Sequence, residues 1–578
     1  SAFLFIFSKD TEWSSFSVLG KSIQEKYEGK YENLKIYASG TGVFAHSINN
    51  KSAQDLKLSE SISIPLTFIL LVFVFGGLVA SAMPLLVGVS AILGSFLIIY
   101  LLTLFTGVSI FALNLITGLG LGLGIDYSLL VVNRFREELH AGKSVDDSIK
   151  QTINTAGKTV FYSGLTIVIT LASLTLFPQM FLKSFGYAGV TVVVMAVLGS
   201  LVALPALLAI LGDRIDKVVV RKSAITPKED GRWAQTARFV MRRPVAVVMV
   251  SLVILTVLAA PIKNIVFSQV DSRVLPASNS AAIAAKVISD RFSGQEGNPV
   301  EIIVPKGALM GTQINQYTSE IAKVPGIMRI GDSQVAGDDV RITAIHSMPP
   351  RTPEAEQLIK EIRKIRAPEG TLIGGVAADY ADAQIGIAKT MPWALLWIAL
   401  GVLILLFIFT GSIILPIKAV ILNILSLGAT LGAISWIFID GHLKWLVGDF
   451  TTTGTVDTGS IILVAVVSFG LSMDYELFLL SRIKEEHDAG KSNIESVATG
   501  LQRSARIITA AASLLAIVFA SFMLSGVTSI KMLGFGVAFA IMLDATLVRA
   551  LLVPALMRLF GERNWWAPKA LKRFTINH

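Results

Sequence analysis

Apolar stretches long enough to cross a membrane recur along this chain. An α-helix needs about 20 consecutive apolar residues to span the hydrocarbon core of a bilayer. Runs of that kind predict eleven spanning helices, near residues 62–82, 84–105, 109–133, 158–177, 184–211, 244–262, 391–410, 413–438, 459–481, 507–525 and 532–558. Two groups of five flank the single span at 244–262, so we expect a polytopic α-helical membrane protein with two helix bundles.

Two longer polar segments alternate strand-like and helix-like patterns. Residues 264–390 show helical apolar spacing over Ser280–Phe292 and Glu354–Arg366, and strand-like patterns over Val300–Val304, Val340–Ile345 and Thr371–Ile373. Residues 1–61 predict a strand at 2–7, a helix near 14–27 and a strand at 34–38. Both segments are therefore expected to form small α+β units of the βαβ kind.

Positive charge collects in a few short loops. The chain is 53% hydrophobic and 16% charged, with a formal net charge of +9. Its Lys and Arg residues cluster after the third span, within 213–243, after the ninth span and in the tail from residue 559. The positive-inside rule places such loops in the cytoplasm, so 1–61 and 264–390 lie outside. This distribution indicates membrane lipids as partners and argues against nucleic acid.

These patterns divide the chain into seven parts. They are the remnant of a first extracytoplasmic α+β domain (1–61), a five-helix bundle (62–212), a basic cytoplasmic linker (213–243), the helix that opens the second half (244–263), a second extracytoplasmic α+β domain (264–390), a second five-helix bundle (391–558) and a basic cytoplasmic tail (559–578). An odd number of spans with an outside start suggests that a leading helix is missing, so twelve spans are expected in the full protein.

Metal and cofactor sites are not expected. The chain has no cysteine, which excludes disulfides and thiolate ligands. His140, His442 and His487 lie at loops or helix ends without further ligands at useful spacing. No metal ion and no cofactor are therefore predicted.

The two halves repeat the same sequence pattern at an offset of 348 residues. The offset aligns Asp126-Tyr127 with Asp474-Tyr475, Arg134 with Arg482, and the tetrapeptide Ala-Gly-Lys-Ser that begins at Ala141 with the one that begins at Ala489. Parallel repeats related about the membrane normal are a known transporter design, with sites at the midplane between the halves. The repeat therefore predicts two pseudo-symmetric bundles.

An Asp-Tyr pair stands in the middle of the third span of each bundle. A carboxylate at mid-bilayer costs about 2.5–3.5 kcal/mol on insertion scales, so such residues usually face the protein interior and move ions or protons. A purely structural role, in which each Asp bonds a neighbouring helix, is the alternative. We expect the two spans to meet at the pseudo-twofold axis, where each carboxyl reaches the tyrosine of the other half. Two such carboxyls would titrate as a coupled pair and would switch helix positions when protonated.

Supporting residues surround this motif. Gly122, Gly124 and Gly470 permit close helix contact or local unwinding, although packing alone explains them equally well. Asp544 and Arg549 lie in the last span. A separation of five residues does not place them on one face of an α-helix, so Arg549 could instead extend toward the cytoplasm.

Two enzyme classes are disfavoured. The Ala-Gly-Lys-Ser repeats have Glu137 and Glu485 where a phosphate-binding loop needs glycine, so they predict a helix stop and cap, with Gly142 and Gly490 just past the helix ends. Intramembrane aspartyl proteases place their two acids on consecutive spans, whereas six spans and an outer domain separate these acids. A secondary transporter, rather than an enzyme, is predicted.

The paired Asp-Tyr motifs, the basic loops that follow them and the closing stretch 561–568 together resemble the MmpL transporters of the resistance-nodulation-division superfamily, in its actinobacterial branch. The resemblance implies porter-like outer domains and proton-driven movement of lipids from the bacterial inner membrane toward the cell envelope. By motif match, Asp126, Tyr127, Asp474 and Tyr475 would relay protons. Asp544 and Arg549 would match the essential acid and arginine of the last helix.

The function predicted from this resemblance is proton-coupled export of an amphipathic lipid or glycolipid, with a trehalose monomycolate-like cargo favoured. Envelope accessory proteins are candidate partners, and the oligomeric state stays open. One alternative is a drug or small-metabolite efflux pump with the same proton relay. Another is a lipid- or sterol-sensing receptor on the same fold, which would not need both Asp-Tyr pairs.

Overall fold

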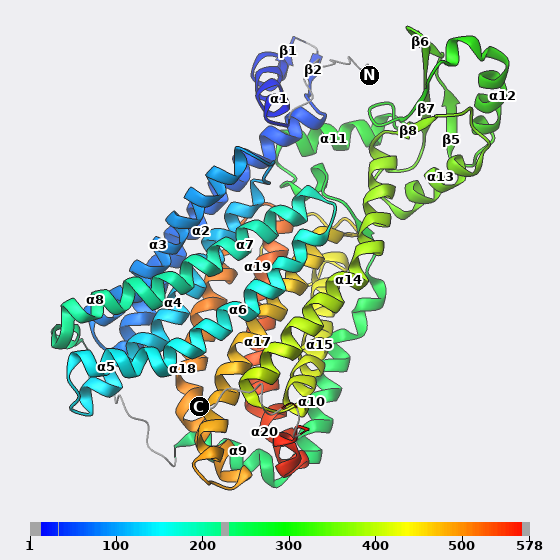
Figure 1. The fold of residues 1–578 in the computed structure, drawn as a ribbon. Coiled ribbons are helices and arrows are strands. Elements are labelled where there is room, and N and C mark those ends of the chain that lie inside the picture. The colour runs from blue at the N-terminus through cyan, green and yellow to red at the C-terminus, as the bar shows by residue number, and fades with distance from the viewer. Residues whose placement is uncertain (1–12, 33, 221–230, 569–570, 572–578) are drawn as a thin grey trace.

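The structure is a computed structural model that describes residues 13–32, 34–220, 231–568 and 571. Eleven helices in this part of the chain are long and apolar enough to cross a membrane. Figure 1 shows them as one bundle, with two smaller outer elements at one end, one containing α1 (Trp13–Tyr27) and the other containing β4 (Val300–Val304) and β7 (Asp339–His346). The predicted fold class, a polytopic helical membrane protein, is confirmed. The strand predicted at 2–7 lies outside the described residues.

The spanning helices form two sets of similar order. The first set comprises α2 (Thr41–Phe75), α3 (Leu78–Thr103), α4 (Phe111–His140), α5 (Val145–Thr152) continuing into α6 (Lys158–Ala172), and α7 (Met180–Leu198) continuing into α8 (Leu204–Leu211). The second set comprises α10 (Pro244–Ala259), α14 (Val376–Thr410), α15 (Ile414–Ile434), α17 (Thr458–Asp488), α18 (Asn493–Ser521), α19 (Thr528–Leu543) and α20 (Val553–Phe560). A short helix, α9 (Arg232–Arg242), precedes α10.

Helices α4 and α17 form the centre of the bundle. In each of them 94% of the apolar 18-residue stretch that could cross the membrane is buried inside the protein. In the span that begins at Pro244 the buried share is 11%. Helix α4 packs against α18 and helix α17 packs against α6, so each central helix contacts the other half. The residues carried by α4 and α17 are therefore shielded from lipid and lie where the halves meet.

Both helices that enter the bundle from outside are longer than the apolar runs predict. Helix α2 is continuous through residue 61, and α14 is continuous through residue 390, so both predicted domain boundaries fall inside helices. The first two spans were expected at 62–82 and 84–105, but α2 already ends before Gly76. Gly76 adopts the left-handed conformation with φ 75°, which stops the helix inside a continuous apolar run.

The second outer domain is built on one antiparallel sheet. Its strand order is β5 (Ile327–Ile330), β7 (Asp339–His346), β4 (Val300–Val304) and β8 (Leu372–Gly374), with β6 (Gln334–Ala336) paired to β7. Strands β4 and β5 run in the same direction on either side of β7, with α12 (Gly311–Ala322) between them in sequence. Strands β7 and β8 flank β4 in the same way, joined through α13 (Pro353–Lys364). The domain is thus two interleaved split βαβ units.

The predicted strands at 300–304, 340–345 and 371–373 correspond to β4, β7 and β8, whereas α12, β5 and β6 were not predicted. Helix α11 (Ser280–Arg291) lies apart from this sheet, beside α1 (Trp13–Tyr27), as Figure 1 shows. The described part of the first outer segment contains α1 and a hairpin of β1 (Gly29–Tyr31) and β2 (Leu34–Ile36).

Candidate functional site

Each aspartate of the Asp-Tyr motif lies near the tyrosine of the other half, and we call each such pair a diagonal. One diagonal, formed by Asp474 and Tyr127, is joined through a serine. Asp474 of α17 and Tyr127 of α4 are 4% or less exposed. Between them lies Ser163 of α6, whose hydroxyl donates to Asp474 Oδ1 and lies 3.2 Å from the Tyr127 hydroxyl oxygen. An acid of the second half and a tyrosine of the first half therefore share one buried hydroxyl.

The other diagonal is close but unsatisfied. Asp126 and Tyr475 lie next to each other, 3% and 4% exposed. Neither Asp126 Oδ1 nor the Tyr475 hydroxyl has a hydrogen-bond partner among the described residues. A buried polar atom without a partner costs about 1–3 kcal/mol, so a small shift that brings the carboxyl and the phenol of this pair together is favourable. The two diagonals are therefore chemically unequal, because Ser163 bridges the pair Asp474 and Tyr127.

Asp544 and Arg549 form a direct ion pair, both about 3% exposed. The prediction that their spacing would separate them is wrong because residues Asp544–Leu552 form a π-helix, η10. In a π-helix each turn closes between residues five apart, so these side chains lie on one face. Arg549 also donates to the Ser472 carbonyl oxygen at 3.2 Å, and its guanidinium carbon lies 4.6 Å from the Tyr475 ring centre. The arginine is buried against the motif and does not extend to the cytoplasm.

A polar pocket opens beside this ion pair. Its lining includes Asp544, Arg549 and Tyr475, together with the polar side chains of Asn423, Ser426, Ser468 and Ser472 from α15 and α17. The hydroxyl of Ser468 has no hydrogen-bond partner in the described part of the chain. Small polar side chains around a buried ion pair suit water and protons better than an acyl chain.

The three motif glycines differ in what they permit. A Cβ on Gly124 would lie 2.5 Å from Gly88 Cα and 2.9 Å from Gly88 N, so this glycine allows the backbones of α3 and α4 to touch. A Cβ on Gly122 would collide with the Leu515 side chain of α18, which can move. A Cβ on Gly470 would meet Thr170 Cβ at 3.5 Å, an ordinary contact. Close packing is therefore the role of Gly124, and Gly470 has room for a methyl group.

The outer end of α17 is capped by Asp457. Its Oδ2 accepts from the Ser460 backbone N–H and hydroxyl, both at 2.6 Å. Asp457 also belongs to strand β9 (Val456–Asp457), which pairs with β3 (Phe267–Ser268) and so links the start of the second outer domain to α17. Loss of hydration raises the pKa of the Asp457 carboxyl, while its hydrogen bonds to Ser460 and the charge of Arg351 oppose that rise.

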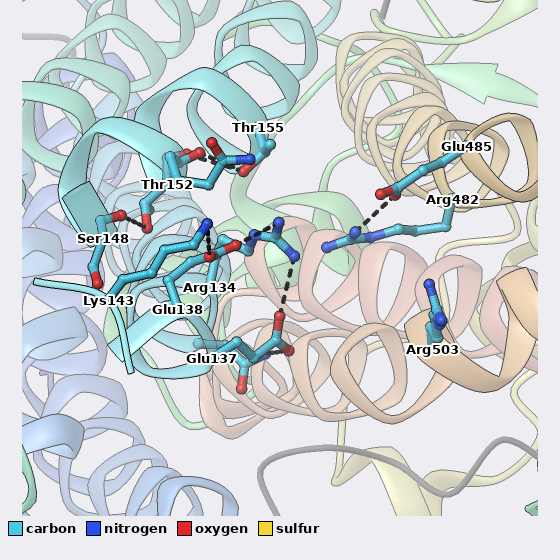
Figure 2. Close-up of polar contacts among 12 residues, drawn as sticks. Arg134, Glu137, Glu138, Lys143, Ser148, Thr152, Thr155, Arg482, Glu485 and Arg503 are labelled. Atoms are coloured by element: carbon cyan, nitrogen blue, oxygen red, sulfur yellow. Dashed lines mark hydrogen bonds and ion pairs between the residues drawn. The ribbon is translucent and has the colours of Figure 1, made fainter. Parts of the chain in front are cut away.

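The cytoplasmic ends of α4 and α17 repeat one charged arrangement, part of which Figure 2 shows. Glu138 pairs with Arg134 at 2.6 Å and with Lys143 at 2.7 Å. Glu486, at the corresponding position of the repeat, pairs with Lys491 at 2.6 Å and with Arg503.

The lysines follow Gly142 and Gly490, whose φ values are +87° and +90°. Ser144 and Ser492 then accept from backbone N–H groups and cap the next helices. The predicted helix stop and cap is confirmed, and both acidic side chains are held by the turn that follows them.

Three site residues were missed by the sequence reasoning. Ser163 stands in an apolar span without any distinguishing pattern. Glu476 directly follows Asp474-Tyr475, and Lys418 is a single charge within an apolar run, so both were visible as intramembrane charges. Both are buried, at 3% and 6% exposed.

Known proteins resemble this chain along most of its length. The sequence profile of the MMPL family matches residues 15–247 and 332–575. The trehalose monomycolate exporter MmpL3 of Mycobacterium tuberculosis H37Rv is 32% identical over an aligned region of 608 positions. This region covers 98% of this chain and 64% of the exporter. The mycolic acid-containing lipids exporter MmpL11 of Mycolicibacterium smegmatis is 31% identical over 571 residues, which cover 95% of this chain and 59% of the exporter.

Two further similarities concern a bacterial membrane protein and a solved structure. The Streptomyces coelicolor membrane protein SCO6666 is 39% identical over 540 residues, covering 93% of this chain and 75% of that protein. The crystal structure of SecDF in its super-membrane-facing form matches with a TM-score of 0.52 at 16% identity, covering 89% of this chain and 63% of SecDF. At that identity the match concerns the fold alone. The chain thus spans less than two thirds of the length of these two mycobacterial exporters and of SecDF.

Proposed function

The chain belongs to the MMPL family, and on that premise we propose that it is a proton-driven exporter of amphipathic lipid or glycolipid. It is a multi-pass protein of the inner membrane, with eleven candidate spans in its described part. The proposed direction is from this membrane toward the cell envelope. A trehalose monomycolate-like glycolipid is the favoured cargo, because relatives at about a third identity are named as exporters of such lipids.

The observation that carries the proposal is the unequal pair of diagonals across the central helices. Asp474 and Tyr127 share the Ser163 hydroxyl, whereas Asp126 Oδ1 and the Tyr475 hydroxyl lack partners among the described residues. Protonation of one carboxyl removes a charge and adds a hydrogen-bond donor, so it changes which diagonal is favoured. A charge that crosses a potential of 100 mV releases about 2.3 kcal/mol, comparable to the cost of one unmade buried hydrogen bond.

Arg549 supports this proposal from the second half. Its positive charge acts on both Asp126 and Asp474 and on the ring of Tyr475. A fixed cation near two buried carboxyls offsets part of the cost of taking their charges out of water, so a carboxylate can form again after a proton has bound. The proposed cycle is therefore protonation of a carboxyl, exchange of tyrosine partners between the halves, and release of the proton on the other side.

The test replaces each relay acid in a cell that depends on this exporter. Asp126→Asn and Asp474→Asn keep the side-chain shape but remove the titratable proton. We expect both variants to accumulate in the membrane at the normal level and to stop delivery of the glycolipid to the envelope. Normal lipid delivery by both variants would overturn the proposal.

Parallel measurements separate the rival functions. Loss of dye efflux without loss of lipid delivery would indicate a drug efflux pump. Lipid binding without any proton flux in vesicles would indicate a sensing receptor.

A further inference from the structure

A second buried charge pair lies in the second half, close to the relay. Glu476 stands on α17 directly after Tyr475, and Lys418 stands on α15. Their charges act on each other, and Arg549 is the second cation that acts on the Glu476 carboxyl. Glu476 Oε1 has no hydrogen-bond partner among the described residues. A buried acid with an unpaired oxygen is expensive in a membrane, which makes it a candidate for function and not only for packing.

Buried polar atoms continue from this pair toward the cytoplasmic end of the bundle. Lys418 Nζ lies 3.0 Å from Met557 Sδ. The Met557 carbonyl oxygen accepts from Asn493 Nδ2 at 2.9 Å and from Asn564 Nδ2 at 2.8 Å. Asn493 is the first residue of α18, and Asn564 lies in the short helix η11 (Gly561–Trp565) after α20.

Both asparagines are buried, and the Oδ1 atoms of both lack partners in the described part of the chain. Asn493 comes shortly after the cytoplasmic turn between α17 and α18. Buried oxygen atoms without hydrogen-bond partners among the described residues thus occur at Glu476 on α17 and, near the cytoplasmic turns, at Asn493 and Asn564.

The first half has no counterpart of this charge. The residue at the position of Glu476, 348 residues earlier, is Ser128, which donates to the Gly124 carbonyl oxygen at 2.6 Å. Its hydroxyl also lies 3.3 Å from that of Ser200. Asp544 and Arg549 likewise have no charged counterpart, since Ala196 and Leu201 stand 348 residues earlier. Buried ionisable residues therefore gather in the second half, which indicates a one-sided role.

Resting on the proton-driven function proposed above, we propose that Glu476 is a third proton-binding carboxyl of the relay. It opens a cytoplasmic proton path in the second half alone, lined by Lys418, Asn493 and Asn564. A proton that leaves the Asp474 region binds the Glu476 carboxylate and neutralises it. The proton then passes from the neutral carboxyl to water at the cytoplasmic end, which restores the carboxylate beside the Lys418 ammonium. No bond other than O–H forms or breaks.

The test measures proton entry into vesicles that contain the purified protein and a pH-sensitive dye, with an imposed proton gradient. We expect Glu476→Gln to lower proton flux by at least about tenfold, the lower range for loss of one acid-base group. Glu476→Asp keeps a titratable group and should retain part of the flux. Ser128→Ala is the matched control at the corresponding position of the first half, and it should behave as the wild type.

A double variant separates proton carriage from a structural ion pair. Removing one member of a buried pair leaves an uncompensated charge and destabilises the fold, whereas replacing both members is often tolerated. We expect Glu476→Gln with Lys418→Met to melt close to the wild type and yet to remain deficient in proton flux. Wild-type flux in this double variant would overturn the inference.

The same vesicles distinguish this inference from the proposed function. Asp474→Asn is included as the variant that removes the relay itself. If Asp474→Asn abolishes flux while Glu476→Gln conducts normally, the third carboxyl is refuted and the exporter proposal stands. If the wild type carries no more flux than empty vesicles, the proposed function fails and this inference fails with it.

Discussion

Ser163 gives the sharpest prediction for the relay, because its hydroxyl donates to Asp474 and lies within hydrogen-bond distance of the Tyr127 hydroxyl. Ser163→Ala removes this bridge and leaves a carboxyl and a phenol facing a methyl group. A hydrogen bond to a charged group is worth about 1.5–3 kcal/mol. At 1.4 kcal/mol for each factor of ten, the bridged arrangement should become about 10- to 100-fold less populated.

The assay for Ser163→Ala is the initial rate of proton entry into vesicles under a fixed gradient. We expect that rate to fall by a similar factor if the bridged arrangement is an intermediate of the cycle. The matched control is Ser173→Ala, which follows α6 in the same span. Ser173 is equally buried, but its hydroxyl donates to the Thr170 carbonyl oxygen of its own span, at 2.6 Å.

Two results would refute this reasoning. An undiminished rate in Ser163→Ala would mean that protons do not pass through the bridged diagonal. An equal fall in both alanine variants would mean that any buried hydroxyl of this span has the same effect.

Three further predictions follow from the geometry. Gly124→Ala should destabilise the protein by about 1–3 kcal/mol because a Cβ there meets the α3 backbone. Gly470→Ala is the control and should leave the melting temperature unchanged. Equal melting temperatures for the two variants would contradict this prediction. Arg549→Met should cost about 3–5 kcal/mol because it leaves the Asp544 charge buried and unpaired, and adding Asp544→Asn should recover most of that loss in a thermal melt. Asp457 has a raised folded-state pKa, so its proton stabilises the fold below about pH 3.9, its unfolded value, and this stabilisation is lost as the pH rises through the folded value. Asp457→Asn keeps a capping oxygen, so it should gain stability relative to the wild type as the pH is raised from 4 to 7. A constant stability difference between the two proteins across that range would count against the shifted pKa of this carboxyl.

Periodicity and repetition predicted the parts of the fold that depend on local sequence. The eleven apolar runs correspond to eleven candidate spans in the part of the chain that the structure describes, and the Ala-Gly-Lys-Ser turns end and begin helices as expected. Strand β4 matches its predicted bounds because Val300–Val304 is a short β-branched run before a proline. Helix ends were harder, since α2 stops at Gly76 within a run that stays apolar to residue 82.

The site could be predicted only in part. The repeat identified Asp126, Tyr127, Asp474 and Tyr475 because a charged residue in an apolar span is conspicuous. It could not identify Ser163, since a serine in a spanning helix usually bonds its own backbone and only tertiary packing aims it elsewhere.

The π-helix that unites Asp544 with Arg549 was also beyond pattern reasoning. That segment contains neither glycine nor proline to mark a change of helix type, and its hydrogen-bond pattern depends on the packing around it. Glu476 and Lys418 were visible as intramembrane charges, but only the structure shows that both side chains are buried.

The central claim, that proton passage through the relay drives lipid movement, is tested most directly by recording both fluxes in the same vesicles. The purified protein would be reconstituted with a fluorescent trehalose glycolipid and an internal pH dye, and a proton gradient would be imposed. We predict that lipid movement and proton entry start together in the wild type and are both lost in Asp474→Asn. Lipid movement at the wild-type rate in Asp474→Asn, or in the wild type after the gradient has been collapsed, would contradict the account.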